Sequence, residues 1–128
     1  MADGKEYRRC HRFVIPDGKV QYKKFGVFGL QKTFSDVHTI INISKGGLSF
    51  SCSDNLKKGK GILVRLLIPD EGHLDLCGRI RWQKSIHGSS RYSFGVLFDS
   101  FSEKKAYNNL EALDFLRKLD KQYIAAYR

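Results

Sequence analysis

The sequence lacks any hydrophobic run that could cross a membrane as a helix. No apolar stretch approaches the roughly 20 residues that spanning requires. The first residues are also too polar and charged for a secretory signal. We therefore expect a cytoplasmic protein without a membrane span. Its 128 residues fit one domain, long enough to bury a core without disulfides or metal.

The sequence is poor in the patterns that build metal centres, disulfides and active sites. Its three cysteines are odd in number, lie far apart and form no CxxC pair, so we expect reduced thiols. Its four histidines are scattered, without the i, i+4 spacing of a zinc hydrolase. No P-loop occurs, no base neighbours a candidate nucleophile, and no carboxylate pair stands out. We expect no enzyme, no catalytic residue, no metal and no cofactor.

Basic side chains, by contrast, are abundant. The chain holds 23 Lys and Arg against 13 Asp and Glu, a net charge of +10. The first 34 residues carry eight of the basic and three of the acidic residues, so positive charge is densest there. This favours an anionic partner such as nucleic acid, a nucleotide or an acidic surface. Charge alone fits a merely solvated basic surface equally well.

The segment from residue 11 to residue 98 shows the alternation of short β-strands. Six or seven such strands, joined by short turns and without βαβ spacing, predict an all-β antiparallel barrel or sandwich. The side chains expected to share a face within their strands are Ile41 and Ile43; Leu48, Phe50 and Cys52; Leu74, Leu76, Gly78, Ile80 and Trp82; and Tyr92, Phe94, Val96 and Phe98.

After Phe101 the apolar residues recur near the spacing of a helix. Ser102 is a suitable N-cap, and we expect one helix over roughly 103–126. Its apolar stripe is best explained by packing on the barrel, with contact to a partner as the alternative.

Three arginines stand close together near the N-terminus: Arg8, Arg9 and Arg12. Their charges repel one another and few apolar side chains anchor them, so we expect residues 1–12 to form a flexible arm. A planar guanidinium matches phosphate oxygens or the O6/N7 edge of guanine with two hydrogen bonds.

A second motif lies in the segment TIINISKGGLSF. Asn42 and Ser44 are one pleat apart and should share a face, where their amide and hydroxyl groups can read a nucleobase edge. Gly46 and Gly47 permit positive φ and a close backbone approach. Taken alone, the pattern fits an ordinary turn before a glycine hairpin.

Together, Arg8-x-x-x-Arg12 and Asn42-x-Ser44-x-x-Gly47 resemble the PilZ family of bacterial second-messenger receptors. Members of that family carry RxxxR just before a barrel and (D/N)xSxxG on a barrel strand. The GRIRW segment, the FGVLF segment and the C-terminal helix follow in the expected order. The similarity covers roughly residues 6–125.

The resemblance implies a six-stranded antiparallel β-barrel with a C-terminal helix that binds cyclic di-GMP. The expected division is an arginine arm over 1–12, a barrel over 13–101 and a helix over 102–128. The arm would become ordered around the ligand and relay the signal to an unidentified protein partner. The implied ligand-binding residues are Arg8, Arg9, Arg12, Asn42, Ser44, Gly47 and Trp82.

Several points stay open at this stage. Trp82 can stack on a base or fill the barrel, and Asn42 stands where many members carry Asp, which accepts hydrogen bonds more strongly. A basic barrel with exposed aromatics also suits single-stranded nucleic acid, although that role does not require the two motifs. The sequence leaves the downstream pathway, the number of ligands and the oligomeric state undetermined.

Overall fold

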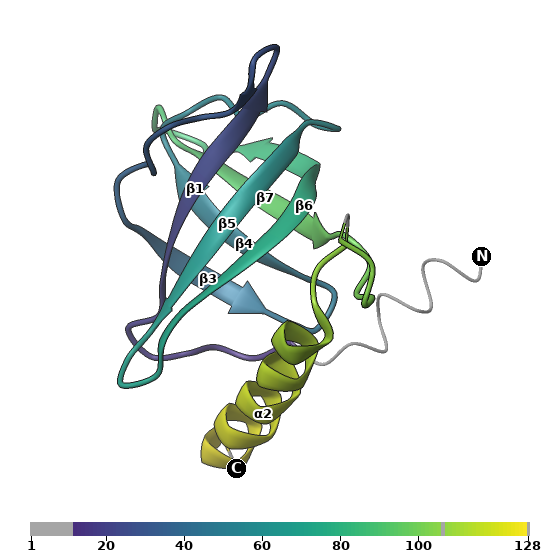
Figure 1. The fold of residues 1–128 in the computed structure, drawn as a ribbon. Coiled ribbons are helices and arrows are strands. Elements are labelled where there is room, and N and C mark those ends of the chain that lie inside the picture. Colours follow the sequence, from purple (N-terminus) through teal and green to yellow (C-terminus); the bar gives the residue numbers. More distant parts are fainter. Residues whose placement is uncertain (1–11, 106, 128) are drawn as a thin grey trace, which may run out of the picture.

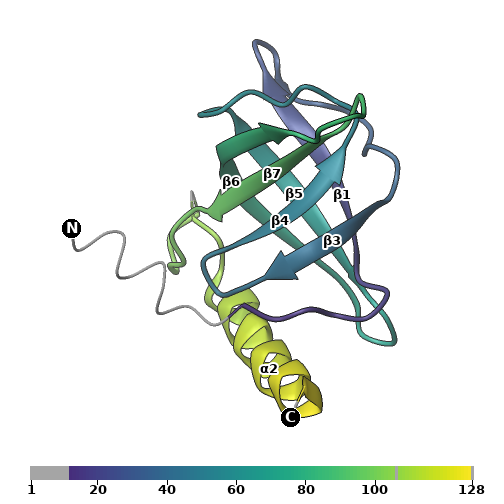
Figure 2. The ribbon, with the colours of Figure 1, turned by 180° about the vertical axis from the view of Figure 1, so that it is seen from behind.

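The strands close into a barrel with a helix at one end (Figures 1 and 2). The computed structural model describes residues 12–105 and 107–127. Six strands form a closed antiparallel barrel, in which pairing of β1 with β5 completes the order β1-β3-β4-β7-β6-β5, and the two-residue β2 extends β1. The elements are β1 Lys19–Gly26, β2 Gly29–Leu30, β3 His38–Ile43, β4 Gly47–Cys52, β5 Gly61–Ile68, β6 Gly72–Ser85, β7 Tyr92–Phe98 and α2 Leu110–Tyr127.

The barrel interior follows the alternation of the sequence. Along β5 every second residue is buried, while the outward Arg65 donates two hydrogen bonds to the Asp75 carboxylate at 2.7 and 2.8 Å. The predicted inward faces of β4 and β7 are confirmed, apart from Tyr92, which is only partly buried. The core is therefore built from the period of two that defines a strand with one buried face.

Two strands depart from that period because each contains a bulge. In β3, Ile40 pairs with Phe50 but Asn42 pairs with Ser49, so the register shifts by one residue. Ile40 and Ile43 are buried and Ile41 is 44% exposed. The expectation that Ile41 and Ile43 share a face is wrong, because the extra residue reverses the side-chain direction within the strand.

The second bulge lies in β6 and moves Trp82 out of the core. Ile80 pairs with Val96 and Trp82 with Gly95, so two steps on β6 match one step on β7. Ile80 is 2% exposed, whereas Trp82 is 36% exposed. The predicted common phase of Trp82 with Leu76 and Ile80 is therefore wrong beyond Ile80.

The C-terminal helix begins later than predicted, at Leu110 rather than near 103. The Asn109 side chain is its N-cap, accepting a hydrogen bond from the Ala112 amide at 2.7 Å. The Ser102 hydroxyl instead accepts from the Lys104 amide at 3.3 Å. Asn108 is tied to the backbone of Cys77 by two side-chain hydrogen bonds of 2.8 and 2.9 Å, which delays the helix.

Helix α2 packs on the barrel end through the buried Ala112, Leu116 and Leu119. The Tyr123 ring stacks on Phe13, with centroids 6.5 Å apart. Phe13 in turn exchanges two backbone hydrogen bonds with Ile43, of 2.8 and 2.9 Å. The residue that follows Arg12 is thus fixed between β3 and the helix. Within the described ranges, no helix is both long and apolar enough to span a membrane.

Candidate ligand-binding site

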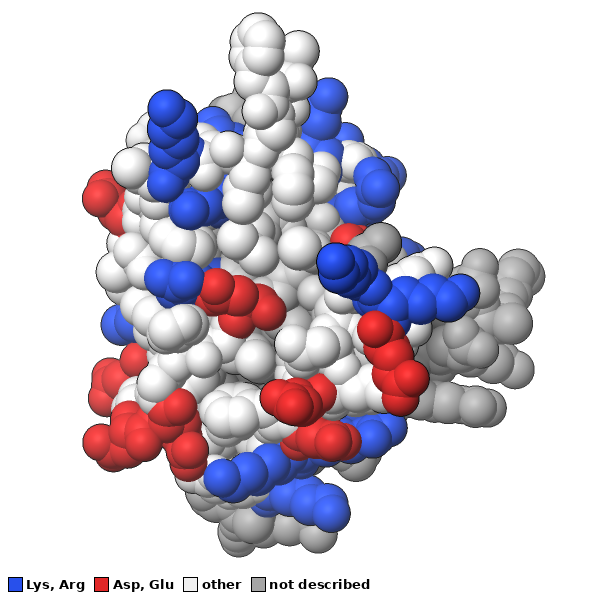
Figure 3. All heavy atoms as spheres, viewed as in Figure 1, with Lys and Arg blue, Asp and Glu red and all other residues white. Residues whose placement is uncertain are grey.

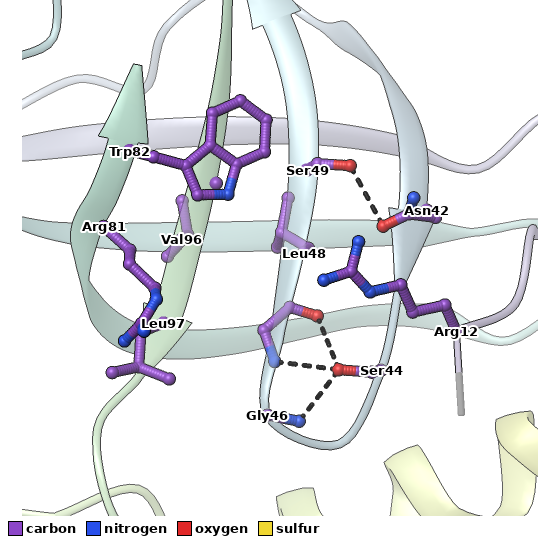
Figure 4. A pocket seen from close by; sticks show the side chains of 12 residues that line it. Arg12, Asn42, Ser44, Gly46, Leu48, Ser49, Arg81, Trp82, Val96 and Leu97 are labelled. Carbon is purple, nitrogen blue, oxygen red and sulfur yellow. Dashed lines mark hydrogen bonds between the residues drawn. The ribbon is translucent and has the colours of Figure 1, made fainter. Parts of the chain in front are cut away.

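An open cavity of about 90 Å³ lies where β3, β4, β6 and β7 meet (Figure 4). All four strands and the segment before Phe13 contribute residues to it, so residues far apart in the sequence lie close together. Its lining residues are Arg12, Asn42, Ser44, Gly46, Gly47, Leu48, Ser49, Arg81, Trp82, Gly95, Val96 and Leu97.

Five of the seven predicted site residues line this one cavity: Arg12, Asn42, Ser44, Gly47 and Trp82. Arg8 and Arg9 lie outside the described residues. Sequence reasoning missed Arg81, Ser49 and Gly95. The Arg-x-Arg-Trp run was visible, but only the bulge in β6 brings Arg81 and Trp82 to the same cavity.

Arg12 precedes Phe13, which pairs with Ile43 of β3, and its side chain lines the cavity. Because Phe13 is buried and bonded to Ile43, the backbone beside Arg12 is held in place. The Arg12 side chain is exposed and reaches toward the space between Asn42 and Ser44 in Figure 4. Its guanidinium therefore stands over the strand that carries the second motif.

Asn42 is oriented by its neighbour across the strand pair. The Ser49 hydroxyl donates to Asn42 Oδ1 at 3.0 Å, and Ser49 is buried. A carbonyl oxygen has two lone pairs, so Oδ1 can accept one more hydrogen bond, and the amide nitrogen still has donors to offer. Asn42 thus keeps the capacity to contact a base edge.

Ser44 has a structural task that sequence reasoning did not assign. Its Oγ accepts hydrogen bonds from the Gly46 and Gly47 amides at 3.1 and 3.2 Å, which closes the turn between β3 and β4 (Figure 4). It also donates to the Gly47 carbonyl at 3.4 Å. The hydroxyl is therefore hydrogen-bonded within the turn, and the contact of Asn42 and Ser44 with a base edge stays a prediction.

Gly47 is required by a close backbone approach. A Cβ at this position would lie 2.1 Å from the Val96 carbonyl oxygen, well inside contact distance. Gly47 does not have a positive φ. Of the two possibilities that the sequence allowed, positive φ is not used at Gly47, and the close backbone approach is found, here toward Val96 of β7.

Trp82 lies over a second glycine, on the outside of the barrel. A Cβ at Gly95 would lie 2.0 Å from Trp82 Nε1 and 2.3 Å from Cε2, so the indole rests on the bare backbone of β7. Trp82 was expected either to fill the barrel interior or to stack on a base. The structure excludes the first alternative, because the side chain lies outside the barrel and is partly exposed. The ring forms one wall of the cavity and keeps a partly exposed face for stacking.

The charge of the cavity is of one sign. Arg12 and Arg81 are its charged residues, and none of the twelve described residues that line it is Asp or Glu. Two guanidinium groups, an amide and an indole suit an anionic ligand with flat, hydrogen-bonding rings. No group of His, Cys, Asp and Glu in the described part of the chain could hold a metal ion.

Known proteins resemble this chain in both sequence pattern and fold. The model of the PilZ domain family matches residues 6–114. Among curated proteins, none matches the sequence. The structure of the Bacillus subtilis inhibitor of motility MotI/DgrA is similar with a TM-score of 0.69 and 13% identity, covering 94% of this chain and 53% of that one.

Two further structures contain cyclic di-GMP. The PilZ domain of YcgR from Escherichia coli has a TM-score of 0.64 and 12% identity, with 94% of each chain covered. The K. pneumonia MrkH–c-di-GMP complex has a TM-score of 0.68 and 16% identity, covering 94% of this chain and 53% of that one. The chain thus spans about half the length of MotI and MrkH.

Proposed function

We propose that this chain, which belongs to the PilZ domain family, is a cytoplasmic receptor that binds cyclic di-GMP in the cavity between Arg12 and Trp82. The observation that carries the proposal is that Arg12 of the first motif lines the same cavity as Asn42, Ser44 and Gly47 of the second motif, together with Arg81. The cyclic di-GMP in the similar YcgR and MrkH structures supports the choice of ligand.

Four cavity residues have a chemically suitable part of the ligand to contact. Cyclic di-GMP presents two phosphates and two guanines. Arg12 and Arg81 would pair with phosphate oxygens or with a guanine O6/N7 edge, and a guanidinium plane can also stack on a purine. Trp82 would stack on a base, and Asn42 would accept from guanine N1 or N2. These are binding roles, and the proposal includes no chemical reaction.

The size of the cavity explains why more of the chain is needed. Its volume of about 90 Å³ is well below the roughly 300–1,000 Å³ of ligand pockets that enclose a small molecule. The cavity on the barrel can therefore contact only part of the ligand. We assign the outer cover to the segment before Arg12, which carries Arg8 and Arg9, and we propose that its ordering signals to a protein partner.

The binding itself is tested by calorimetric titration with cyclic di-GMP. Trp82 is the only tryptophan, so its fluorescence should change in parallel. Arg81→Ala should weaken binding by about 10-fold or more, because a hydrogen bond to a charged group contributes roughly 1.5–3 kcal/mol. Arg117→Ala removes the same charge from an exposed face of α2 and should bind like the wild type.

A single-stranded oligonucleotide is titrated in the same way. Tight binding of the oligonucleotide without binding of cyclic di-GMP would replace the proposed function with the nucleic-acid alternative. The cover is tested separately by hydrogen exchange in residues 1–11, which should slow at saturating ligand. Unchanged exchange alongside clear calorimetric binding would remove the arm from the mechanism and leave the cavity as the site.

A further inference from the structure

The hairpin between β1 and β2 projects an apolar tip from the barrel. Val27 is 96% exposed and Phe28 is fully exposed. Gly26 pairs with Gly29, so these two side chains form the whole tip. Figures 1 and 2 both place this hairpin at the end of the barrel opposite α2.

Turn formation does not explain these two side chains. Gly29 has the positive φ of +100° that the hairpin needs. Tight turns otherwise favour Gly, Asn, Asp and Ser, whereas a β-branched residue and a phenylalanine are unusual there. Phe25 and Leu30, which pair across the same hairpin, are also more than one third exposed. The apolar surface is therefore larger than the turn requires.

Lysines surround this apolar tip. Lys24, Lys57 and Lys60 line a cavity of about 410 Å³ at its base, together with Phe25 and Val27. Figure 3 shows the uncharged tip projecting at the top with basic side chains on both sides, while most acidic side chains on this face lie lower. The exposed lysines of the hairpin and of the neighbouring loop are Lys24, Lys32, Lys57, Lys58 and Lys60. We call the apolar residues and these lysines the hairpin tip.

We propose that the hairpin tip docks on the surface of a lipid bilayer that contains anionic lipids. Its apolar residues would enter the interface between headgroups and acyl chains, while the lysines would meet the headgroups. A protein partner fits less well, because a stable protein interface buries about 800 Å² on each side, whereas the projecting turn consists of Val27 and Phe28 alone. A bilayer needs no matching shape.

This docking would leave the candidate ligand site accessible. Ile43, next to Ser44, is bonded to Phe13, and Phe13 stacks on Tyr123 of α2, so the Ser44 turn lies at the helix end of the barrel. The tip lies at the other end (Figure 1). A protein docked by its tip would therefore hold the arginine-lined turn away from the bilayer. The proposal does not depend on the identity of the ligand.

The test uses sedimentation of the full chain with two kinds of vesicle. One is phosphatidylcholine alone, and the other contains about one quarter phosphatidylglycerol. We expect binding to the anionic vesicles and little to the neutral ones. The double variant V27S/F28S should bind at least about 10-fold more weakly, since it loses the burial of a phenylalanine and a valine.

The contribution of the lysines is measured with a matched pair of triple variants. K57Q/K58Q/K60Q should weaken vesicle binding by about 100-fold, or about five-fold for each lysine near the membrane. K104Q/K105Q/K121Q removes the same charge from exposed positions outside the tip and should bind within a few-fold of the wild type. As a direct readout, the fluorescence of F28W in a W82F background should shift to the blue with anionic vesicles.

Three outcomes would overturn the proposal. Absence of binding to anionic vesicles would leave the tip to some other partner. Equal binding of V27S/F28S and wild type would mean adsorption by net charge alone. Equal losses in the two lysine triples would mean that the position of the charge is irrelevant. All substituted side chains are exposed, so circular dichroism should show unchanged folding.

Discussion

The protein has two basic regions, and they differ in the kind of cation that each contains. The cavity between Arg12 and Trp82 has arginines, an amide and an indole, in a turn and two bulged strands that fix their directions. The hairpin tip has lysines around exposed aliphatic and aromatic side chains. Positive charge thus lies beside flat polar groups in the cavity and beside exposed apolar side chains at the hairpin tip.

This difference follows from the two side chains. A guanidinium is planar and donates in a fixed fork, so it selects the geometry of a phosphate or a guanine edge. A lysine ammonium is a compact point charge on a flexible stem, so it adds attraction with little geometric selection. If the comparison holds, changes of geometry should affect the cavity, and changes of charge should affect the tip.

The largest expected effect comes from Arg12. Arg12→Ala should weaken cyclic di-GMP binding by about 10- to 150-fold, the equivalent of a charged hydrogen bond of roughly 1.5–3 kcal/mol. Arg12→Lys should recover little of this loss, because it keeps the charge but not the fork. Calorimetry at one salt concentration measures both. Wild-type affinity in Arg12→Lys would show that Arg12 acts only as a charge and would break the comparison.

A similar loss without any change of charge is expected from Gly95→Ala. The new Cβ would lie 2.0 Å from Trp82 Nε1, so the indole must leave its place on β7. Base stacking contributes roughly 1–3 kcal/mol, so affinity should fall by about 5- to 150-fold, and Trp82 fluorescence should change before ligand is added. Gly26→Ala is the control, since the nearest atom to its Cβ is 3.8 Å away. Unchanged affinity in Gly95→Ala would remove Trp82 from the binding site.

The pairing of Trp82 with Gly95 shows where sequence reasoning stopped. Alternation predicted the inward faces of β4 and β7, and two short motifs predicted four of the cavity residues, because both signals are local. Trp82 was the fifth, from the GRIRW segment. A bulge adds one residue and inverts the direction of every later side chain in the strand. Neither Ile41 nor Arg81 is a residue type that indicates a bulge in the sequence. Arg81 and Gly95 therefore became visible only through the strand register.

The late start of the helix and the role of the Ser44 hydroxyl in its own turn both depend on hydrogen bonds that the sequence does not display. Both Ser102 and Asn109 are residue types that can cap a helix. The side-chain hydrogen bonds of Asn108 to Cys77 hold the chain out of the helix before Asn109, so Asn109 is the N-cap. The Ser44 hydroxyl can face a ligand or its own turn, and the Gly46 and Gly47 amides engage it. In both cases several polar partners were possible, and tertiary structure selected one.

Salt should weaken vesicle binding and cyclic di-GMP binding to different extents, by less than the substitutions above. Raising the ionic strength from about 0.01 M to 0.1 M shortens the screening length from about 30 Å to about 10 Å. Vesicle binding by several exposed lysines should then weaken by about 10-fold, whereas cyclic di-GMP binding should weaken by only a few-fold. Sedimentation and calorimetry over the same salt series give the two slopes. Equal slopes would mean that the cavity binds its ligand by charge alone.

Asn42→Asp should change the affinity for cyclic di-GMP by a smaller factor and raise it rather than lower it. The Ser49 hydroxyl can donate to a carboxylate as it does to Asn42 Oδ1 at 3.0 Å, so the side chain should keep its place. A carboxylate accepts more strongly from guanine N1 and N2 than an amide does. Affinity should therefore rise by a few-fold although the net positive charge falls, as calorimetry can measure. The vesicle affinity should not change. Weaker ligand binding would contradict the assigned guanine contact.

The smallest effect concerns pH, and it should act on the barrel between the two regions. The pKa of His38 is lowered, first by burial and then by the positive charge of Arg91; its ring stacks on Tyr22 and lies tilted against Phe50. Below its ordinary pKa of 6.5, the unfolded chain therefore binds the proton more readily than the folded chain. Stability should be full above that value and decline as the pH falls from about 6.5 to 5, before most carboxylates titrate.

Melting curves of wild type and His38→Gln across this window measure the decline, which should be smaller in the variant. An equal decline in both proteins would assign it to another group. Since His38 lines neither cavity, ligand and vesicle binding by the folded protein should be the same with and without it.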